Sequence, residues 1–106
     1  MAFLKHKYNA VPVEADGIKF PSKLEAKYYE YLKLRKRIGE VVVFLMQVPF
    51  RLPGGVFYRV DFVEFRADGT THFIDTKGKD TQESINKRKQ VEELYAPIKI
   101  EIVKGV

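Results

Sequence analysis

The most apolar part of the chain runs from Val41 to Phe50, where only Gln47 and Pro49 interrupt a series of aliphatic and aromatic residues. A nearly continuous run of this kind, rich in β-branched side chains, predicts a strand that is buried on both faces. Further apolar segments follow at 56–66 and 71–77, and turn residues separate the three: Pro53-Gly54-Gly55 and then Asp68-Gly69. The pattern therefore predicts an antiparallel meander of three strands.

Helical spacing is found on both sides of this meander. Leu24, Tyr28, Tyr31 and Leu32 form one apolar stripe, and Ser22 stands where it would cap the same helix. The remaining predicted elements are a hairpin over 11–20 around an Asp-Gly turn, a helix over 23–38, a second helix over 81–95 that Pro97 ends, and an alternating strand over 98–103.

The order of these elements predicts the fold class. A hairpin followed by α-β-β-β-α-β is typical of an α/β (α+β) protein in which helices flank a mixed central sheet. The 106 residues contain no repeat and no linker-like tract, so we expect a single domain over 1–106. Within it, 1–21 form a basic N-terminal arm and hairpin, and 22–103 form the core.

Composition narrows the classes of function. There is no cysteine, which excludes disulfides, thiolate metal sites and cysteine nucleophiles, and only two histidines are present, His6 and His72. The net charge is +5, and residues 1–39 carry all of it, with nine basic and four acidic residues. This asymmetry favours a polyanionic partner such as nucleic acid, although an ordinary solvated basic surface explains it equally well. No apolar run could span a membrane and no secretory signal is recognisable, so we expect a soluble, cytoplasmic protein.

Three acidic residues stand where a folding sequence would not ordinarily place them. Asp61 and Asp75 interrupt two of the predicted strands, although aspartate has a poor strand propensity. If Asp68-Gly69 is the hairpin tip, the two carboxylates lie toward the same end of the strand pair, and Lys77 shares a face with Asp75. Glu25 lies on the side of the first helix that faces the body of the protein.

Carboxylates that converge on one partly buried site repel each other unless they are protonated or balanced by a cation. A hard divalent cation with oxygen ligands is the natural solution, and Mg²⁺ is typically held by one or two carboxylates together with water and substrate phosphate. A neighbouring lysine such as Lys77 could stabilise negative charge in a phosphoryl-transfer transition state or orient the attacking water.

This constellation resembles the PD-(D/E)XK nuclease superfamily. The resemblance rests on Asp61, on the Asp75-Thr76-Lys77 motif, and on Glu25 in the preceding helix. It covers 22–103, and the predicted element order is similar to the superfamily's restriction-endonuclease-like core. The segment from Asp16 to Ala26 also resembles a small phage-encoded branch that is related to archaeal-type Holliday junction resolvases. Val60 stands where many members have proline, a departure that is common in the superfamily.

The resemblance implies a Mg²⁺-dependent DNA endonuclease acting on branched DNA, with four-way junctions as the expected substrate and Mn²⁺ as a substitute metal. It implies that Glu25, Asp61 and Asp75 bind the metal together with the carbonyl of Thr76, and that Lys77 is catalytic with the three carboxylates. A nicking or end-processing nuclease of the same fold is one alternative. A non-catalytic DNA-binding recombination accessory protein is another.

Each site residue also has a simpler interpretation. Glu25 matches a capping-box partner for Ser22, three residues earlier. Asp61 could pair with Arg59 on the same strand face, and Asp75 with Lys77 could form an exposed ion pair of little energetic value. These alternatives stay open on the sequence alone.

DNA binding would require basic and small polar groups along the phosphate backbone. The lysines predicted to contact DNA are Lys5, Lys7, Lys19, Lys23, Lys79, Lys87 and Lys89. No zinc finger, winged helix or aromatic recognition motif is present, and neither an organic cofactor nor a membrane partner is expected. One chain of this size carries one active site, and symmetric cutting needs two, so we expect a C2 homodimer. The 41–50 strand and the tyrosine-rich first helix are the candidate interface.

Overall fold

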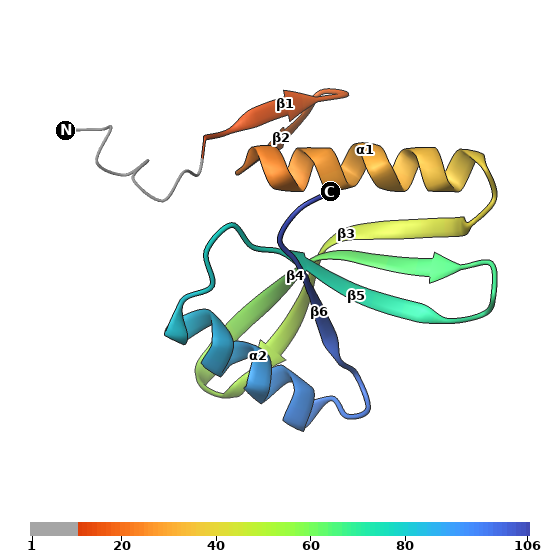
Figure 1. The fold of residues 1–106 in the computed structure, drawn as a ribbon. Coiled ribbons are helices and arrows are strands. Elements are labelled where there is room, and N and C mark those ends of the chain that lie inside the picture. Colours follow the sequence, from red (N-terminus) through yellow and green to blue (C-terminus); the bar gives the residue numbers. More distant parts are fainter. Residues whose placement is uncertain (1–10) are drawn as a thin grey trace.

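The computed structural model describes residues 11–106 (Figure 1), and the elements occur in the predicted order. They are β1 (Val13–Ala15), β2 (Ile18–Phe20), α1 (Lys23–Arg37), β3 (Val41–Leu52), the 3₁₀ turn η2 (Pro53–Gly55), β4 (Val56–Arg66), β5 (Thr71–Thr76), α2 (Gln82–Leu94) and β6 (Ile100–Val103). None of the helices in this part of the chain is long and apolar enough to cross a membrane.

Two sheets make up the β structure. β1 and β2 form a small antiparallel hairpin, and both of its turn residues, Asp16 and Gly17, have the positive φ that a two-residue hairpin turn requires. The main sheet has the order β3-β4-β5-β6, in which β3, β4 and β5 are antiparallel and β6 runs parallel to β5. The α2 crossover makes the parallel pair possible. The prediction of a mixed central sheet with two helices is confirmed.

The prediction that the 41–50 strand is buried on both faces is wrong. β3 pairs only with β4 and therefore forms one edge of the main sheet. Val42, Val43 and Leu45 are 62%, 41% and 48% exposed. An apolar run indicates that a strand tends to be buried, but it does not say whether other elements cover both of its faces or whether another strand pairs with its free edge.

The main sheet separates two hydrophobic cores. One contains residues of α1 and the hairpin together with Phe62 and Ile74, and the other contains Val91 of α2 together with Val60. The predicted stripe on α1 needs one correction, because Tyr31 is exposed and Tyr29 is buried instead. Tyr29 packs on Phe20 of β2 with ring centroids 5.0 Å apart, so the hairpin covers a side of α1 that the helix pattern alone had left to solvent.

The β3–β4 ribbon changes its packing partner near its middle. Met46 and Phe62, which are paired across the ribbon, belong to the core beside α1, whereas the next pair, Val48 and Val60, belongs to the core beside α2. Gln47 lies between these two pairs and has a φ of 53°, a conformation that a non-glycine residue adopts rarely in a strand. The ribbon therefore bends where the two cores meet, and the acidic residues of the site lie at this bend.

Candidate active site

Three strands bring polar residues into one row across the main sheet. Phe62 pairs with Ile74, so the next positions along β4 and β5 place Asp61 opposite Asp75. The flanking pairs of β3 and β4 place Gln47 opposite Asp61 in the same way. Opposed residues of antiparallel strands share a face, so the predicted convergence of Asp61 and Asp75 is confirmed.

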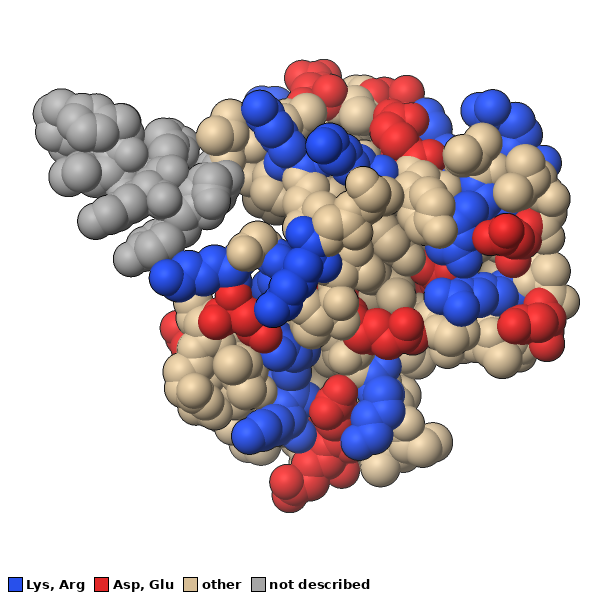
Figure 2. Space-filling view, viewed as in Figure 1, with Lys and Arg blue, Asp and Glu red and all other residues tan. Residues whose placement is uncertain are grey.

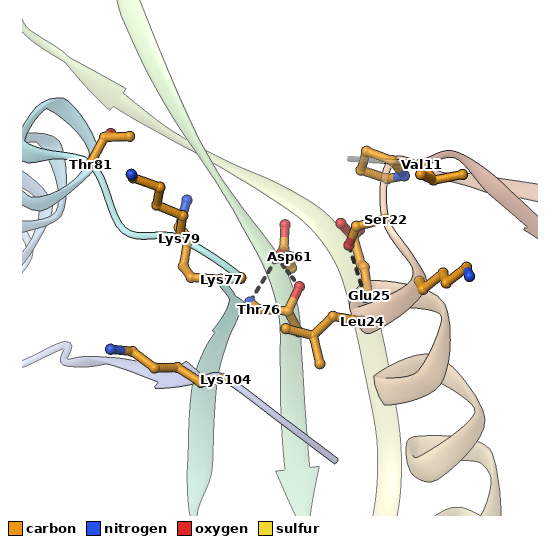
Figure 3. A pocket seen from close by; sticks show the side chains of 13 residues that line it. Val11, Ser22, Leu24, Glu25, Asp61, Thr76, Lys77, Lys79, Thr81 and Lys104 are labelled. Carbon is orange, nitrogen blue, oxygen red and sulfur yellow. Dashed lines mark hydrogen bonds between the residues drawn. The ribbon is translucent and has the colours of Figure 1, made fainter. Parts of the chain in front are cut away.

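The two aspartates bridge the place where β4 and β5 begin to separate. Asp75 Oδ1 accepts a hydrogen bond from the Asp61 backbone N–H at 2.9 Å. Asp61 Oδ2 in turn accepts from both the backbone N–H and the hydroxyl of Thr76, each at 2.9 Å (Figure 3). Asp75 is 1% exposed, and its other oxygen accepts a hydrogen bond from the Tyr58 hydroxyl. The carboxylates are thus held by neutral donors.

Glu25 approaches the row from the first turn of α1. Ser22 caps this helix by accepting from the Glu25 backbone N–H at 3.1 Å. Glu25 as a whole is only 5% exposed. Its carboxylate does not take part in the cap and accepts a hydrogen bond from Gln47 Nε2 at 2.9 Å. The same nitrogen lies 3.4 Å from Asp61 Oδ1. The cap therefore uses the backbone of Glu25, and its side chain faces the other carboxylates.

The alternative pairings of the aspartates do not form. Asp61 is bonded to Thr76 and Gln47, and within residues 11–106 it makes no ion pair with Arg59. Asp75 is buried, and the same part of the chain shows no ion pair between it and Lys77. The suggested partners, Arg59 and Lys77, are close to the two aspartates along the chain, but the aspartates bind other groups.

Burial and mutual repulsion shape the electrostatics. Burial, followed by the negative charges of Asp61 and Asp75, raises the pKa of Glu25 from its ordinary 4.5 to about 7, against the opposing effects of Gln47 and Lys77. Burial is also the main reason why the pKa of Asp61 is raised, and the hydrogen bonds from Thr76 oppose it. The negative charge of the carboxylate cluster is therefore not fully compensated at neutral pH.

This uncompensated charge predicts how the stability of the protein depends on pH in the absence of metal. Because the pKa of Glu25 is higher in the folded protein, its contribution is fully present below about pH 4.5 and is lost as the pH rises to about 7. Glu25→Gln removes that loss. We expect the variant to exceed the wild type in unfolding free energy by roughly 3 kcal/mol at pH 8 and to match it near pH 4.5.

Urea unfolding in EDTA at the two pH values measures this difference. Glu93→Gln, at an exposed position of α2, is the matched control and should leave the pH dependence unchanged. A Glu25→Gln variant that is less stable than the wild type at pH 8, or that differs equally at both pH values, would contradict the electrostatic argument.

A cavity of about 840 Å³ opens beside this row. Figure 3 shows Lys77, Lys79 and Lys104 on one side of it, Glu25 and Ser22 on the other, and Asp61 with Thr76 between them. Its full lining is Val11, Pro21, Ser22, Lys23, Leu24, Glu25, Asp61, Thr76, Lys77, Gly78, Lys79, Thr81 and Lys104. Asp75 does not reach the cavity wall, because it is buried behind Asp61 and Thr76.

The lysines predicted to contact DNA are distributed unevenly. Lys23 and Lys79 line the large cavity, and Lys19 lines a smaller one of about 310 Å³ whose wall also includes Glu25. Lys87 and Lys89 lie on α2 and line neither cavity, and Lys87 is 3.4 Å from Glu83. Lys5 and Lys7 lie outside the described residues. In the space-filling view, Lys and Arg side chains border the region between α1 and α2 (Figure 2).

Several residues of the site escaped the sequence prediction. Gln47 gave one usable signal, because it breaks the apolar run of β3. Lys104 follows the last strand and gave none. Tyr58 holds Asp75 through a contact between two different strands. Arg88 binds Asp80, just before α2, through both of its terminal nitrogens at 2.9 and 2.6 Å. The Arg88–Asp80 pair ties the segment after Lys79 to α2.

The carboxylate and carbonyl oxygens of the site are ligands that suit a hard divalent cation, although the carboxylates do not all converge on a single point. Within residues 11–106, no three His, Asp or Glu side chains are arranged as a metal-binding group. Glu25 and Asp61 nevertheless share one amide donor, the Gln47 nitrogen, at the point where their oxygens converge. Carboxylate oxygens beside a backbone carbonyl are the ligands that Mg²⁺ and Mn²⁺ take.

A family model described as a protein of unknown function (DUF1064) matches residues 5–106. No curated protein and no solved structure matches the chain.

Proposed function

We propose that this chain, which belongs to the DUF1064 family, is a metal-dependent DNA endonuclease of the PD-(D/E)XK type. The observation that carries the proposal is a series of contacts beside a cavity whose wall includes Lys77. Gln47 links the Glu25 and Asp61 carboxylates, and Asp75 binds the backbone of Asp61. The order of α1, β3, β4, β5, α2 and β6 around a mixed sheet is consistent with a restriction-endonuclease-like core.

In this proposal Glu25, Asp61, Asp75 and the carbonyl of Thr76 hold Mg²⁺, with Mn²⁺ as a substitute. A cation bound there would neutralise charge on the scissile phosphate and lower the pKa of water. The Thr76 bonds orient the Asp61 carboxylate, and the buried Asp75 keeps the two strands at a fixed separation. Lys77 supplies a positive charge at the cavity wall, where it can stabilise the developing charge of the transition state.

DNA is the substrate that the cavity wall favours. Lys23, Lys77, Lys79 and Lys104 come from three separate segments and place positive charge along one opening. Such point charges suit the phosphate backbone and carry no base-reading pattern. Gly78, between two of these lysines, leaves open space where a Cβ would stand and so permits close approach of a phosphate. Structure-selective binding of branched DNA, four-way junctions first, fits this arrangement better than sequence readout.

Symmetric cutting of a junction requires two active sites, and therefore two copies of the chain. The exposed apolar residues of β3 lie on an edge strand, which ordinarily needs to be covered. We propose that a second copy covers it in a C2 homodimer.

A lysine introduced among the exposed apolar residues of β3 should separate the two copies. Val42 is the most exposed of these residues, so Val42→Lys is expected to reduce the dimer to a monomer with little effect on the fold. Light scattering coupled to gel filtration gives the mass. Val56→Lys, at a similarly apolar exposed position on β4, is the control and should remain dimeric. A dimeric Val42→Lys protein would move the interface elsewhere.

The proposed function is tested with four-way junction, Y-fork, linear duplex and single-stranded DNA, each with Mg²⁺ or EDTA. Paired, Mg²⁺-dependent nicks on the junction alone are the expected result. Metal-dependent cleavage of the other substrates would support the nuclease activity but contradict the specificity for junctions. Tight binding without cleavage in Mg²⁺ or Mn²⁺ would overturn the proposal in favour of a recombination accessory protein.

A further inference from the structure

Gln47 combines an unusual backbone with an unusual pair of contacts. Apart from glycine, only Asp16 and Gln47 have a positive φ within residues 11–106. Asp16 lies in a hairpin turn, where this conformation is required, but Gln47 lies inside β3. A positive φ in mid-strand costs free energy and is kept where the surroundings or the function demand it.

The backbone conformation delivers the side-chain amide to two acidic groups. Nε2 donates to Glu25 Oε2 at 2.9 Å and lies 3.4 Å from Asp61 Oδ1. A primary amide carries two N–H groups, so one nitrogen can serve both carboxylates. Glu25 comes from α1 and Asp61 from β4, and Gln47 is therefore the residue that links the helix to the sheet at the site.

We propose that Gln47 is a positioning residue that holds the Glu25 and Asp61 carboxylates together when no cation is bound. Its two N–H groups stand in for the positive charge that the cluster lacks. The inference rests on the proposed function only for the identity of the cation; the linking of two carboxylates by one amide is a property of the protein itself.

A charge series at this position separates positioning from simple packing. Gln47→Glu is nearly isosteric but replaces the donor with a further carboxylate, which repels those of Glu25 and Asp61. Gln47→Lys places a permanent positive charge between Glu25 and Asp61. Both variants keep the unfavourable backbone conformation, so its cost cancels when they are compared. A residue that served only packing would respond to both changes in the same direction.

The first measurement is thermal unfolding of the full chain in EDTA at pH 8. We expect Gln47→Glu to lower the melting temperature by about 5 °C and Gln47→Lys to raise it by about as much. Gln90 is an exposed glutamine on α2, so Gln90→Glu and Gln90→Lys repeat the same chemical changes away from the site. Subtracting their shifts removes the effect of net charge.

The second measurement is Mn²⁺ binding by titration calorimetry. We expect Gln47→Lys to weaken binding at least about tenfold, since its ammonium group competes with the cation, and Gln47→Glu to bind at least as tightly as the wild type. Opposite shifts in melting temperature together with this order of affinities would support the inference.

The two arms fail separately. Equal shifts at positions 47 and 90, or shifts of the same sign for the Glu and Lys variants at position 47, would overturn the positioning role whatever the metal does. If the wild type binds no Mn²⁺, the proposed function loses its cation, and the melting temperatures in EDTA still decide the role of Gln47.

Discussion

The Asp75→Asn variant is expected to lose cleavage of its DNA substrate by about 10³-fold, which corresponds to roughly 4 kcal/mol of transition-state stabilisation. Its affinity for the same DNA in EDTA should stay within about threefold of the wild type, because Asp75 is buried and does not line the cavity. The loss follows from removing a carboxylate charge from the proposed metal site without changing the volume of the side chain.

The variant should still fold. An asparagine at position 75 can accept from the Asp61 backbone N–H through Oδ1, as the aspartate does at 2.9 Å. Its amide can donate to the Tyr58 hydroxyl, which is able to reverse its role from donor to acceptor. The fold then keeps both contacts, so that a loss of activity reports on the charge of this residue.

Single-turnover cleavage with Mg²⁺ and a binding titration in EDTA separate chemistry from binding. Asp68→Asn makes the same change at the exposed tip of the β4–β5 hairpin and is expected to cleave like the wild type. Wild-type cleavage by Asp75→Asn would exclude this carboxylate from the chemistry. An unfolded variant would be recognised by its melting curve, and Asp75→Glu would then serve as the second test.

The aspartate pair could be predicted because local turn chemistry sets the register of its strands. Phe65 pairs with Thr71, so the β4–β5 hairpin turns about Asp68, and counting equally in both directions from Asp68 reaches Asp61 and Asp75. The capping of α1 by Ser22 was predictable for the same reason, since it involves residues three positions apart. Short-range rules of this kind also explain why the order of the elements was predicted correctly.

The contacts that complete the site depend on tertiary packing. Neither the link from Gln47 to Glu25 nor that from Tyr58 to Asp75 follows from a periodic pattern, because each joins elements whose relative placement is set by the bend of the β3–β4 ribbon. The mistaken burial of β3 has the same origin. Hydrophobicity predicts which strands tend to be buried, but the elements that cover a strand are decided by the packing of the whole sheet.

Lys77→Met is expected to reduce cleavage by about 10²- to 10³-fold, the usual cost of removing one group that stabilises developing charge. Lys77 follows β5 directly, and its backbone N–H donates to the carbonyl of Val103 at 3.0 Å, a bond that methionine retains. The side chain lines the cavity, and its charge lowers the pKa of both Glu25 and Asp61. The substitution therefore removes a charge at the site without removing a structural contact.

The same cleavage and binding assays apply, with Lys99→Met at an exposed position before β6 as the matched control. Loss of one phosphate contact alone would weaken DNA binding and reduce its salt dependence by about one unit of slope, and saturating DNA would then restore the rate. A catalytic role predicts that the rate stays low at saturation. Restoration at saturating DNA would make Lys77 a binding residue, and the transition-state charge would then have to be met by Lys79 or Lys104, which line the same cavity.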